Sequence, residues 1–329
     1  MPFFALRFDL RNPALAGTTM TERYQAALDM SEWADRLGFV AITISEHHGV
    51  DDGYLPSPLT MAAAIAARTR TARINLSAVV APFHDPLRLA EDLAVVDLIS
   101  GGRLDVILAN GYVADEFAMF GRRLSDRAAA SNEVVATLRA AWTGEPFTYR
   151  GRTVRVTPAP HQPGGPSISL GGSTEPAARR AARLECGFST PSPPAWDFYR
   201  DETIALGRPD PGPHPAVGDT SFFHLAADVE KGWLEVAPYA MHEATSYGKW
   251  MADAGVGAAG GWEAPPADAD ELRARGQYRV LTPDDLVAKL NAGGPFAFAL
   301  FHPLMGGIPP ELGWSSLRLF EEEVLPRVS

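Results

Sequence analysis

The sequence has one cysteine, no long uninterrupted apolar run and no excess of basic residues. Cys186 alone cannot form an intrachain disulfide or a cysteine-rich zinc site, and such scarcity is typical of a reducing cytoplasm. No stretch approaches the roughly 20 consecutive apolar residues that a membrane helix needs. The formal net charge of -11 argues against nucleic acid and anionic membranes as partners, because both require a basic surface. We therefore expect a soluble, cytoplasmic protein.

The 329 residues alternate regularly between short apolar runs and longer amphipathic segments. Runs rich in β-branched and aromatic residues predict strands near 3–9, 40–45, 74–80, 103–109, 167–171, 186–190, 220–227 and 295–301. Segments with apolar residues at three- and four-residue steps predict helices between them. Eight strand–helix units favour an α/β TIM (β/α)8 barrel over an open doubly wound sheet. No G-x-G-x-x-G motif opens the first helix, which argues against a Rossmann domain.

No linker interrupts this pattern, so we expect one domain over residues 1–329 that carries insertion segments. The stretch 145–165 predicts a small hairpin around "RGR", followed by a connection rich in proline and glycine. Residues 230–285 are predicted to be mainly helical, and 252–280 are interpreted as a mobile insertion within that region.

Polar residues gather directly after the predicted strands, which is where barrel enzymes have their active sites. For Glu46, His47 and His48 a metal site, a general acid/base and a helix cap are all open. Adjacent residues that leave a strand point in opposite directions, which weakens the metal interpretation. No i, i+4 set of further ligands supports a metal either. The other strand ends carry His84, Asn110, Gly111, Tyr112 and His302, and the two histidines can equally be structural.

The segment "LGGSTEPAARRAARL" (170–184) runs from a predicted strand into a helix. Glycines that allow close approach, two hydroxyls and free N–H groups at a helix start can form a phosphate cradle. Its members would be Gly171, Gly172, Ser173 and Thr174. A plain N-cap by one of the hydroxyls is the alternative. Arg127, at the start of an earlier helix, could supply a cation to the same phosphate.

Several motifs together resemble the bacterial luciferase-like family of flavin-dependent monooxygenases. They are "EHHGVDDGYLPSPL", "FHDPLRLAEDLAVVDLISGGRLDVILANGY", "DEFAMFG" and "LRAAWTGEPFTYRGR", and the similarity covers most of the chain, most densely 20–190. The resemblance implies a TIM barrel that holds reduced FMN, or a deazaflavin such as coenzyme F420, in its mouth.

The resemblance also implies roles for individual residues. His47 would lie beside the flavin as the catalytic acid/base or as a hydrogen-bond donor. The ordinary pKa of a histidine, near 6.5, suits either role. Ser77 and Ala78 match a non-proline cis peptide beneath the flavin ring. Arg127 matches an arginine that contacts the flavin phosphate. Asn110 stands where luciferase itself has a phosphate-contacting arginine, so the anchoring or the cofactor would differ here.

Glu46, His48, Tyr112 and His302 are then expected in or around the substrate pocket, with no metal. The resemblance implies that reduced FMN and oxygen are used to oxygenate a small organic substrate. A separate reductase would supply reduced flavin, 252–280 is a candidate lid, and the helical segments 58–70 and 86–100 would form a homodimer interface. The open alternatives are a deazaflavin-dependent hydride transfer, a non-catalytic flavin-binding protein and a metal-dependent barrel hydrolase.

Overall fold

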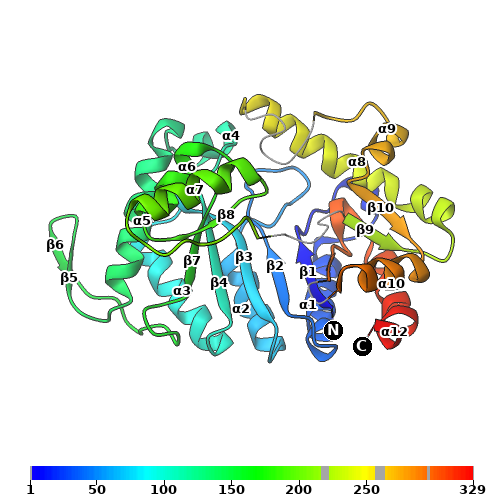
Figure 1. The fold of residues 1–329 in the computed structure, drawn as a ribbon, viewed down its shortest axis with the longest axis horizontal. Helices are drawn as coiled ribbons and strands as arrows, with labels where there is room; N and C mark the ends of the chain where they lie inside the picture. The colour runs from blue at the N-terminus through cyan, green and yellow to red at the C-terminus, as the bar shows by residue number, and fades with distance from the viewer. Residues whose placement is uncertain (1, 216–221, 256–263, 295–296, 329) are drawn as a thin grey trace.

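The centre of the protein is a parallel sheet that curls into a half-barrel (Figure 1). The computed structural model describes residues 2–215, 222–255, 264–294 and 297–328. Seven strands form this sheet in the order β11-β1-β2-β3-β4-β7-β8. Their bounds are β1 Phe3–Phe8, β2 Ala41–Ile44, β3 Arg73–Val80, β4 Leu104–Ala109, β7 Ser167–Gly171, β8 Gly187–Ser189 and β11 Phe298–Phe301. This architecture is the TIM-like α/β barrel that the strand–helix pattern predicted.

The helices follow the strands in chain order. They are α1 Met20–Arg36, α2 Pro58–Arg68, α3 Pro86–Ser100, α4 Ala114–Met119, α5 Arg127–Ala141, α6 Glu175–Arg183, α7 Pro193–Ala205, α8 Val229–Asp253, α9 Ala269–Arg275, α10 Pro283–Ala292, α11 Pro310–Leu319 and α12 Leu325–Val328. Local chemistry fixes several starts: the side chain of Thr19 accepts from the N–H of Glu22, whose carboxylate bonds back, in a capping box before α1. Among these helices none is long and apolar enough to cross a membrane.

Alternation along the strands decides which side chains meet the helices. In β2, Ile42 and Ile44 are fully buried in the main hydrophobic cluster. The intervening Thr43 and the following Ser45 therefore lie on the opposite face, toward the barrel interior. The same alternation puts polar residues on the interior face of β1 and β3, so the interior is polar enough to hold a ligand.

A second parallel sheet completes the wall on the far side of β11. It consists of β9 (Phe222–Leu225) and β10 (Tyr278–Leu281), and Figure 1 shows it beside α8 and α10. Phe223 of β9 packs edge-on against Phe301 of β11 at 4.8 Å between ring centroids. No backbone pairing joins β8 to β9 within the described residues, so the wall is open there.

All eight predicted strands are present, and the hairpin of β5 (Phe147–Tyr149) and β6 (Arg152–Val154) is confirmed. The described residues of 230–285 are mainly helical as predicted, but strand β10 was not predicted. Its four residues are too few to show a period between two helices, and pairing with β9 determines their conformation. Part of the expected insertion, 256–263, lies outside the described residues; the remainder includes α9.

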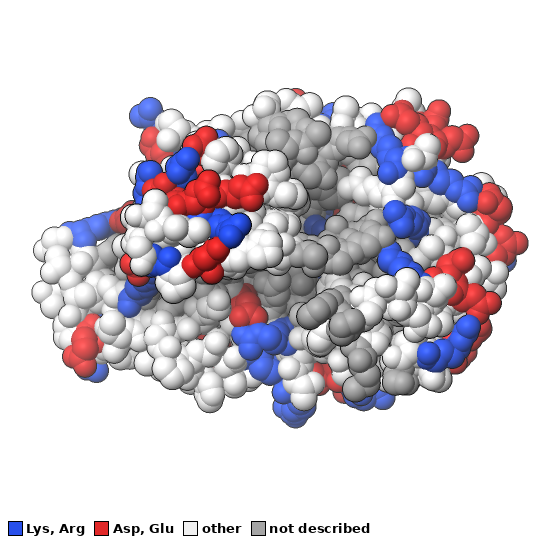
Figure 2. Space-filling model, in the orientation of Figure 1, with Lys and Arg blue, Asp and Glu red and all other residues white. Residues whose placement is uncertain are grey.

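Acidic and basic side chains are interspersed over the described part of the face in Figure 2. Many of them are paired: Arg68, for example, lies 2.8 Å from Asp29 and 2.6 Å from Glu32. Exposed pairs of this kind contribute little to stability, typically below about 1 kcal/mol.

Candidate active site

The exit of β2 sends its three ionisable side chains in different directions. His47 is 7% exposed and faces a cavity at the carboxyl ends of the strands. His48 instead packs between the rings of Phe83 and Phe120, at centroid distances of 5.5 and 4.7 Å. This divergence follows from the alternation of an extended chain.

Glu46 holds the loops after β2 and β3 together. One carboxylate oxygen accepts from the backbone N–H of Val80 at 2.7 Å, and the other pairs with Nε2 of His48 at 2.7 Å and of His84 at 3.0 Å. Burial by itself raises the pKa of Glu46, but these hydrogen bonds outweigh burial and the net shift is downward. The carboxylate of Glu46 is therefore ionised, and both of its oxygens form hydrogen bonds. His84 helps to hold this carboxylate in place.

Glu116, on α4, is the partner of His47. Its Oε1 lies 2.8 Å from Nδ1 of His47 and also accepts the backbone N–H of His48 at 2.9 Å. The carboxylate is 3% exposed. A carboxylate at Nδ1 favours the tautomer with the proton on Nδ1 and leaves Nε2 as the reactive atom. Nε2 has no hydrogen-bond partner within the described residues.

Glu116 was not among the site residues predicted from the sequence. Its signal was an acidic residue in the first turn of the short helix after the fourth strand, beside an equally acidic Asp115. Only the tertiary contact over 69 positions distinguishes the two.

The cavity beside His47 has a volume of about 190 Å³ and lies within the barrel mouth. The peptide bond between Ser77 and Ala78 is cis, as the resemblance implied, and both residues line this cavity. Aromatic side chains pack around the imidazole: Trp250 stacks on it at 4.5 Å and Tyr54 meets it edge-on at 4.8 Å. They shield the site from water while its reactive nitrogen stays accessible.

A second cavity of about 270 Å³ adjoins the first, because Ala109, Gly111 and Tyr112 line both. Its other lining residues come from the loop after β4, the start of α5, the loop between β7 and α6, and α8: Asn110, Arg127, Gly171, Gly172, Ser173, Thr174, Ala177, Pro191 and Met251. The structure thus brings together every predicted residue of the phosphate cradle. The two cavities are therefore neighbours, and His47 lines the smaller one.

The local geometry of the cradle suits a phosphate. Thr174 is the N-cap residue of α6, yet its side chain makes no capping hydrogen bond and remains available to a ligand. At Gly172 a Cβ would lie 2.7 Å from the Cβ of Ala177, so only glycine permits this close approach of strand exit and helix.

Arg127 lines the second cavity, and Arg180 of α6, which is not in the lining, lies close enough to be affected by the charge of Arg127. Arg127 donates to the backbone oxygen of Gly111 at 3.4 Å, and neither it nor Arg180 of α6 has an ion pair in the described structure. Burial and then the charge of Arg127 lower the pKa of Arg180. Because the two cations repel without a compensating anion, a bound phosphate would stabilise both. Arg180 was not identified from the sequence, where it is one of three arginines in "ARRAAR".

His302, which was expected in or around the substrate pocket, is not in the lining of either cavity. It sits in a buried cluster with Nε2 3.7 Å from Asp9 and Nδ1 4.0 Å from Glu243. Ligand atoms of this trio lie within 4.8 Å of one another, a spacing that a metal ion could bridge. The neighbouring Arg7 and Arg11 already supply positive charge to Glu243, so charge balance favours an ionic network over a dication site.

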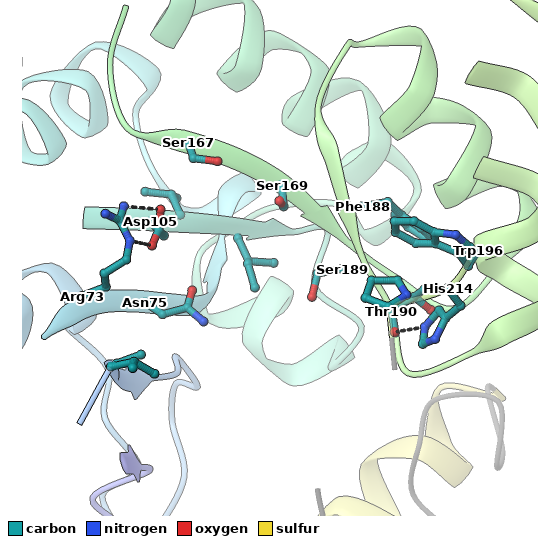
Figure 3. A pocket seen from close by; sticks show the side chains of 15 residues that line it. Arg73, Asn75, Asp105, Ser167, Ser169, Phe188, Ser189, Thr190, Trp196 and His214 are labelled. Carbon is teal, nitrogen blue, oxygen red and sulfur yellow. Dashed lines mark hydrogen bonds and ion pairs between the residues drawn. The ribbon is translucent and has the colours of Figure 1, made fainter. Parts of the chain in front are cut away.

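A third cavity, of about 450 Å³, lies inside the half-barrel toward the amino ends of its strands (Figure 3). Arg73 forms an ion pair with Asp105 across its lining, and Nε2 of His214 lies 3.0 Å from the backbone oxygen of Thr190. These polar groups satisfy one another. Residues at this end of a barrel stabilise the fold, whereas chemistry takes place at the opposite end.

Comparison with known proteins identifies the family. A family model described as "Luciferase-like monooxygenase" matches residues 5–292. The oxygenase component of a flavin-dependent trigonelline monooxygenase from Acinetobacter baylyi is 31% identical over 129 residues, which are 39% of this chain and 36% of that protein. The matches span half or less of the length of the first curated relatives.

Solved structures match over nearly the whole chain. Monooxygenase RslO1 from Streptomyces bottropensis is 28% identical, with a TM-score of 0.73 over 99% of this chain and 100% of that one. The oxygenating constituent of 3,6-diketocamphane monooxygenase from Pseudomonas putida, in complex with FMN, is 19% identical, with a TM-score of 0.72 over 99% and 98%. An F420-dependent secondary alcohol dehydrogenase is 14% identical, with a TM-score of 0.63 over 100% of both chains. The latter two likenesses concern the fold alone.

Proposed function

Because the chain belongs to the luciferase-like monooxygenase family, we propose that it uses reduced FMN and oxygen to oxygenate a small organic substrate. One observation carries the proposal. Two neighbouring cavities with part of their lining in common place an acid/base pair, His47 and Glu116, beside glycine, hydroxyl and arginine groups that suit a phosphate. A flavin mononucleotide has a phosphate and a redox-active ring at its two ends.

The chain's own residues position and protect the reaction. The flavin, when bound, supplies the redox chemistry with oxygen. Arg127, Arg180 and the loop at Gly172 would hold the phosphate. Glu116 fixes the imidazole of His47 so that Nε2 can give or accept a proton at the substrate. The aromatic side chains around His47 exclude water, which would otherwise compete with the substrate.

Titration of the protein with FMN and with riboflavin tests the phosphate end. Arg127→Met should weaken FMN binding about 10- to 100-fold, the range expected for one hydrogen bond to a charged group. Riboflavin, which lacks the phosphate, serves as the control and should bind both proteins equally. Equal FMN affinity in the two proteins would contradict the cradle.

Oxygen uptake tests the catalytic end. With reduced FMN and candidate substrates, His47→Ala should reduce substrate-dependent product formation by roughly 10²- to 10⁴-fold while FMN affinity changes little. A non-catalytic flavin-binding protein would show no substrate-dependent oxygen uptake in either form. Full activity after removal of metals is expected, and a requirement for added zinc would favour the hydrolase alternative.

A deazaflavin-dependent hydride transfer is the second candidate, since Asn110 lines the phosphate end where luciferase itself has an arginine. Titration with FMN, reduced FMN and coenzyme F420 separates the two. Tighter binding of F420, with substrate turnover that continues without oxygen, would establish hydride transfer in place of oxygenation.

We also propose a homodimer through α2 and α3, with reduced flavin supplied by a separate reductase. On α3 the apolar side chains of Val95, Leu98 and Ile99 are 42, 42 and 47% exposed, a pattern that suits a covered face. Leu98→Glu should convert a dimer to a monomer in sedimentation velocity. A wild-type monomer at micromolar concentration would refute the interface, and NADH oxidation by the protein alone would refute the separate reductase.

A further inference from the structure

Arg7 lies in the lining of the cavity that contains His47. It belongs to β1, in which Leu6 and Phe8 are fully buried in the hydrophobic cluster on the helix side. Strand alternation therefore directs Arg7 to the barrel interior. A charged side chain in a buried strand is costly unless something compensates it.

The guanidinium of Arg7 has no hydrogen bond or ion pair with any described residue. Its Nε is sealed from solvent without a partner, whereas its two Nη groups keep some accessible surface. The guanidinium makes a cation–π contact with Phe222, whose ring centroid lies 5.4 Å from the guanidinium carbon. Burial by itself lowers the pKa of Arg7, but nearby tyrosine and carboxylate groups outweigh burial, and the group stays charged.

Arg11, four residues later, differs in its charge environment, although its three guanidinium nitrogens are also buried without a hydrogen bond. Its guanidinium carbon lies 5.0 Å from the ring centroid of Tyr54 and 5.0 Å from that of Trp250, and Nη1 is 3.5 Å from Asp52. Aromatic faces and a carboxylate therefore compensate Arg11. Arg7 has no such enclosure.

The carboxylates that share the cavity with Arg7 are already engaged. Glu116 accepts from His47 and from the backbone of His48, and Glu46 bridges Val80, His48 and His84. Neither forms an ion pair with Arg7. Asp9 and Glu243 act on Arg7 electrostatically, but neither lines this cavity and neither forms a hydrogen bond or ion pair with Arg7 among the described residues.

Tyr112 is a neutral hydrogen-bond donor in the same cavity lining as Arg7. Its hydroxyl has no hydrogen-bond partner within the described residues. Burial, with the charge of Glu116, raises the pKa of Tyr112, so the hydroxyl keeps its proton. Arg7, Tyr112 and Nε2 of His47 are therefore three polar groups in one lining that still lack partners.

We propose that this cavity selects substrates that carry a carboxylate and that Arg7 recognises that carboxylate. The inference rests on the proposed function, since it assigns the substrate class of the same site. A planar guanidinium matches a carboxylate with two parallel hydrogen bonds. Tyr112 can donate a further bond to the same anion, and Nε2 of His47 remains free for the proton transfer.

Calorimetric titration of the flavin-loaded protein with matched acids and amides tests the inference without turnover. The probes are benzoate against benzamide, and hexanoate against hexanamide. We expect wild type to bind at least one acid about 10- to 100-fold more tightly than its amide. Arg7→Met should abolish this preference and leave the affinity for the amide unchanged. Arg7→Lys, which keeps the charge without the planar fork, should retain part of it.

Arg73→Met is the matched control, because Arg73 is also an arginine of an interior strand face but lies in the other cavity, paired with Asp105. It should keep the acid preference. Equal affinity of wild type for every acid and its amide would overturn the inference, as would a preference that survives in Arg7→Met. Loss of reduced-FMN binding in Arg7→Met, with the acid preference intact, would assign Arg7 to the flavin instead. Because these titrations need no oxygenation, failure of the proposed activity would be seen separately in oxygen uptake.

Discussion

Replacing Glu116 by glutamine tests whether the carboxylate acts through His47. The carboxylate accepts two hydrogen bonds through one oxygen, from Nδ1 of His47 at 2.8 Å and from the backbone N–H of His48 at 2.9 Å. A glutamine oxygen in the same position can accept both bonds, but it carries no charge. The positively charged imidazole that forms when Nε2 takes up a proton would therefore lose the counter-ion at Nδ1.

The expected magnitude follows from that single charged hydrogen bond. Bonds to charged groups contribute about 1.5–3 kcal/mol, so turnover in Glu116→Gln should fall about 10- to 100-fold while FMN affinity stays the same. The assay is product formation per oxygen consumed, with KM and kcat determined separately. The sharper measurement is the double variant with His47→Ala.

If Glu116 acts only by orienting His47, removing it in the His47→Ala background should cost nothing more in turnover. Groups that work as a unit lose activity non-additively. Multiplicative losses in the double variant would refute the reasoning, because Glu116 would then act on substrate or flavin independently of the imidazole.

Three further outcomes follow from the structure. His48→Ala should lower the melting temperature, because the ring packs against Phe83 and bonds Glu46, with turnover far less affected than in His47→Ala; equal losses reversed by zinc would favour a metal site. Burial lowers the pKa of His224 from 6.5 to about 4, so its contribution to stability is present above pH 6.5 and is lost as pH falls toward 4. In denaturant unfolding, the free energy of unfolding should fall between pH 7 and pH 4 by up to about 3 kcal/mol less in His224→Phe than in wild type. An equal fall in the two proteins would contradict this. Gly172→Ala should weaken FMN binding at least about tenfold and destabilise the fold by about 1–3 kcal/mol, since the added Cβ meets Ala177 at 2.7 Å; wild-type affinity would contradict the close approach.

Local periodicity made most of the fold predictable. Strands such as β3 and β4 are apolar on alternate positions and separated by amphipathic helices, and these signals do not depend on distant residues. The gathering of Gly172, Thr174 and Arg127 was also accessible, because carboxyl ends of parallel strands converge in a barrel. Strand β10 was not, since four residues between two helices take their conformation from pairing with β9.

The finer features of the site depend on contacts that a single sequence does not encode locally. Glu116 meets His47 across 69 positions, and nothing nearby distinguishes it from Asp115. A strand end specifies a level in the barrel but not the partners of a side chain. The sequence therefore did not show that the ring of His302 lies 3.7 Å from Asp9 and 4.0 Å from Glu243.

The two arginines of "LRFDLRNP" show where sequence reasoning stops and structure becomes necessary. Alternation places Arg7 on the interior side of β1, away from the buried Leu6 and Phe8, and Arg11 follows three residues after the end of that strand. Both are cations in a buried setting, so both need compensation. For Arg11 it comes from within the chain, through the rings of Tyr54 and Trp250 and the carboxylate of Asp52. Around Arg7, Asp9 and Glu243 act only without direct contact, and the described chain supplies an aromatic ring but no hydrogen bond or ion pair. The cavity beside His47 leaves room for the anion of a substrate to supply both.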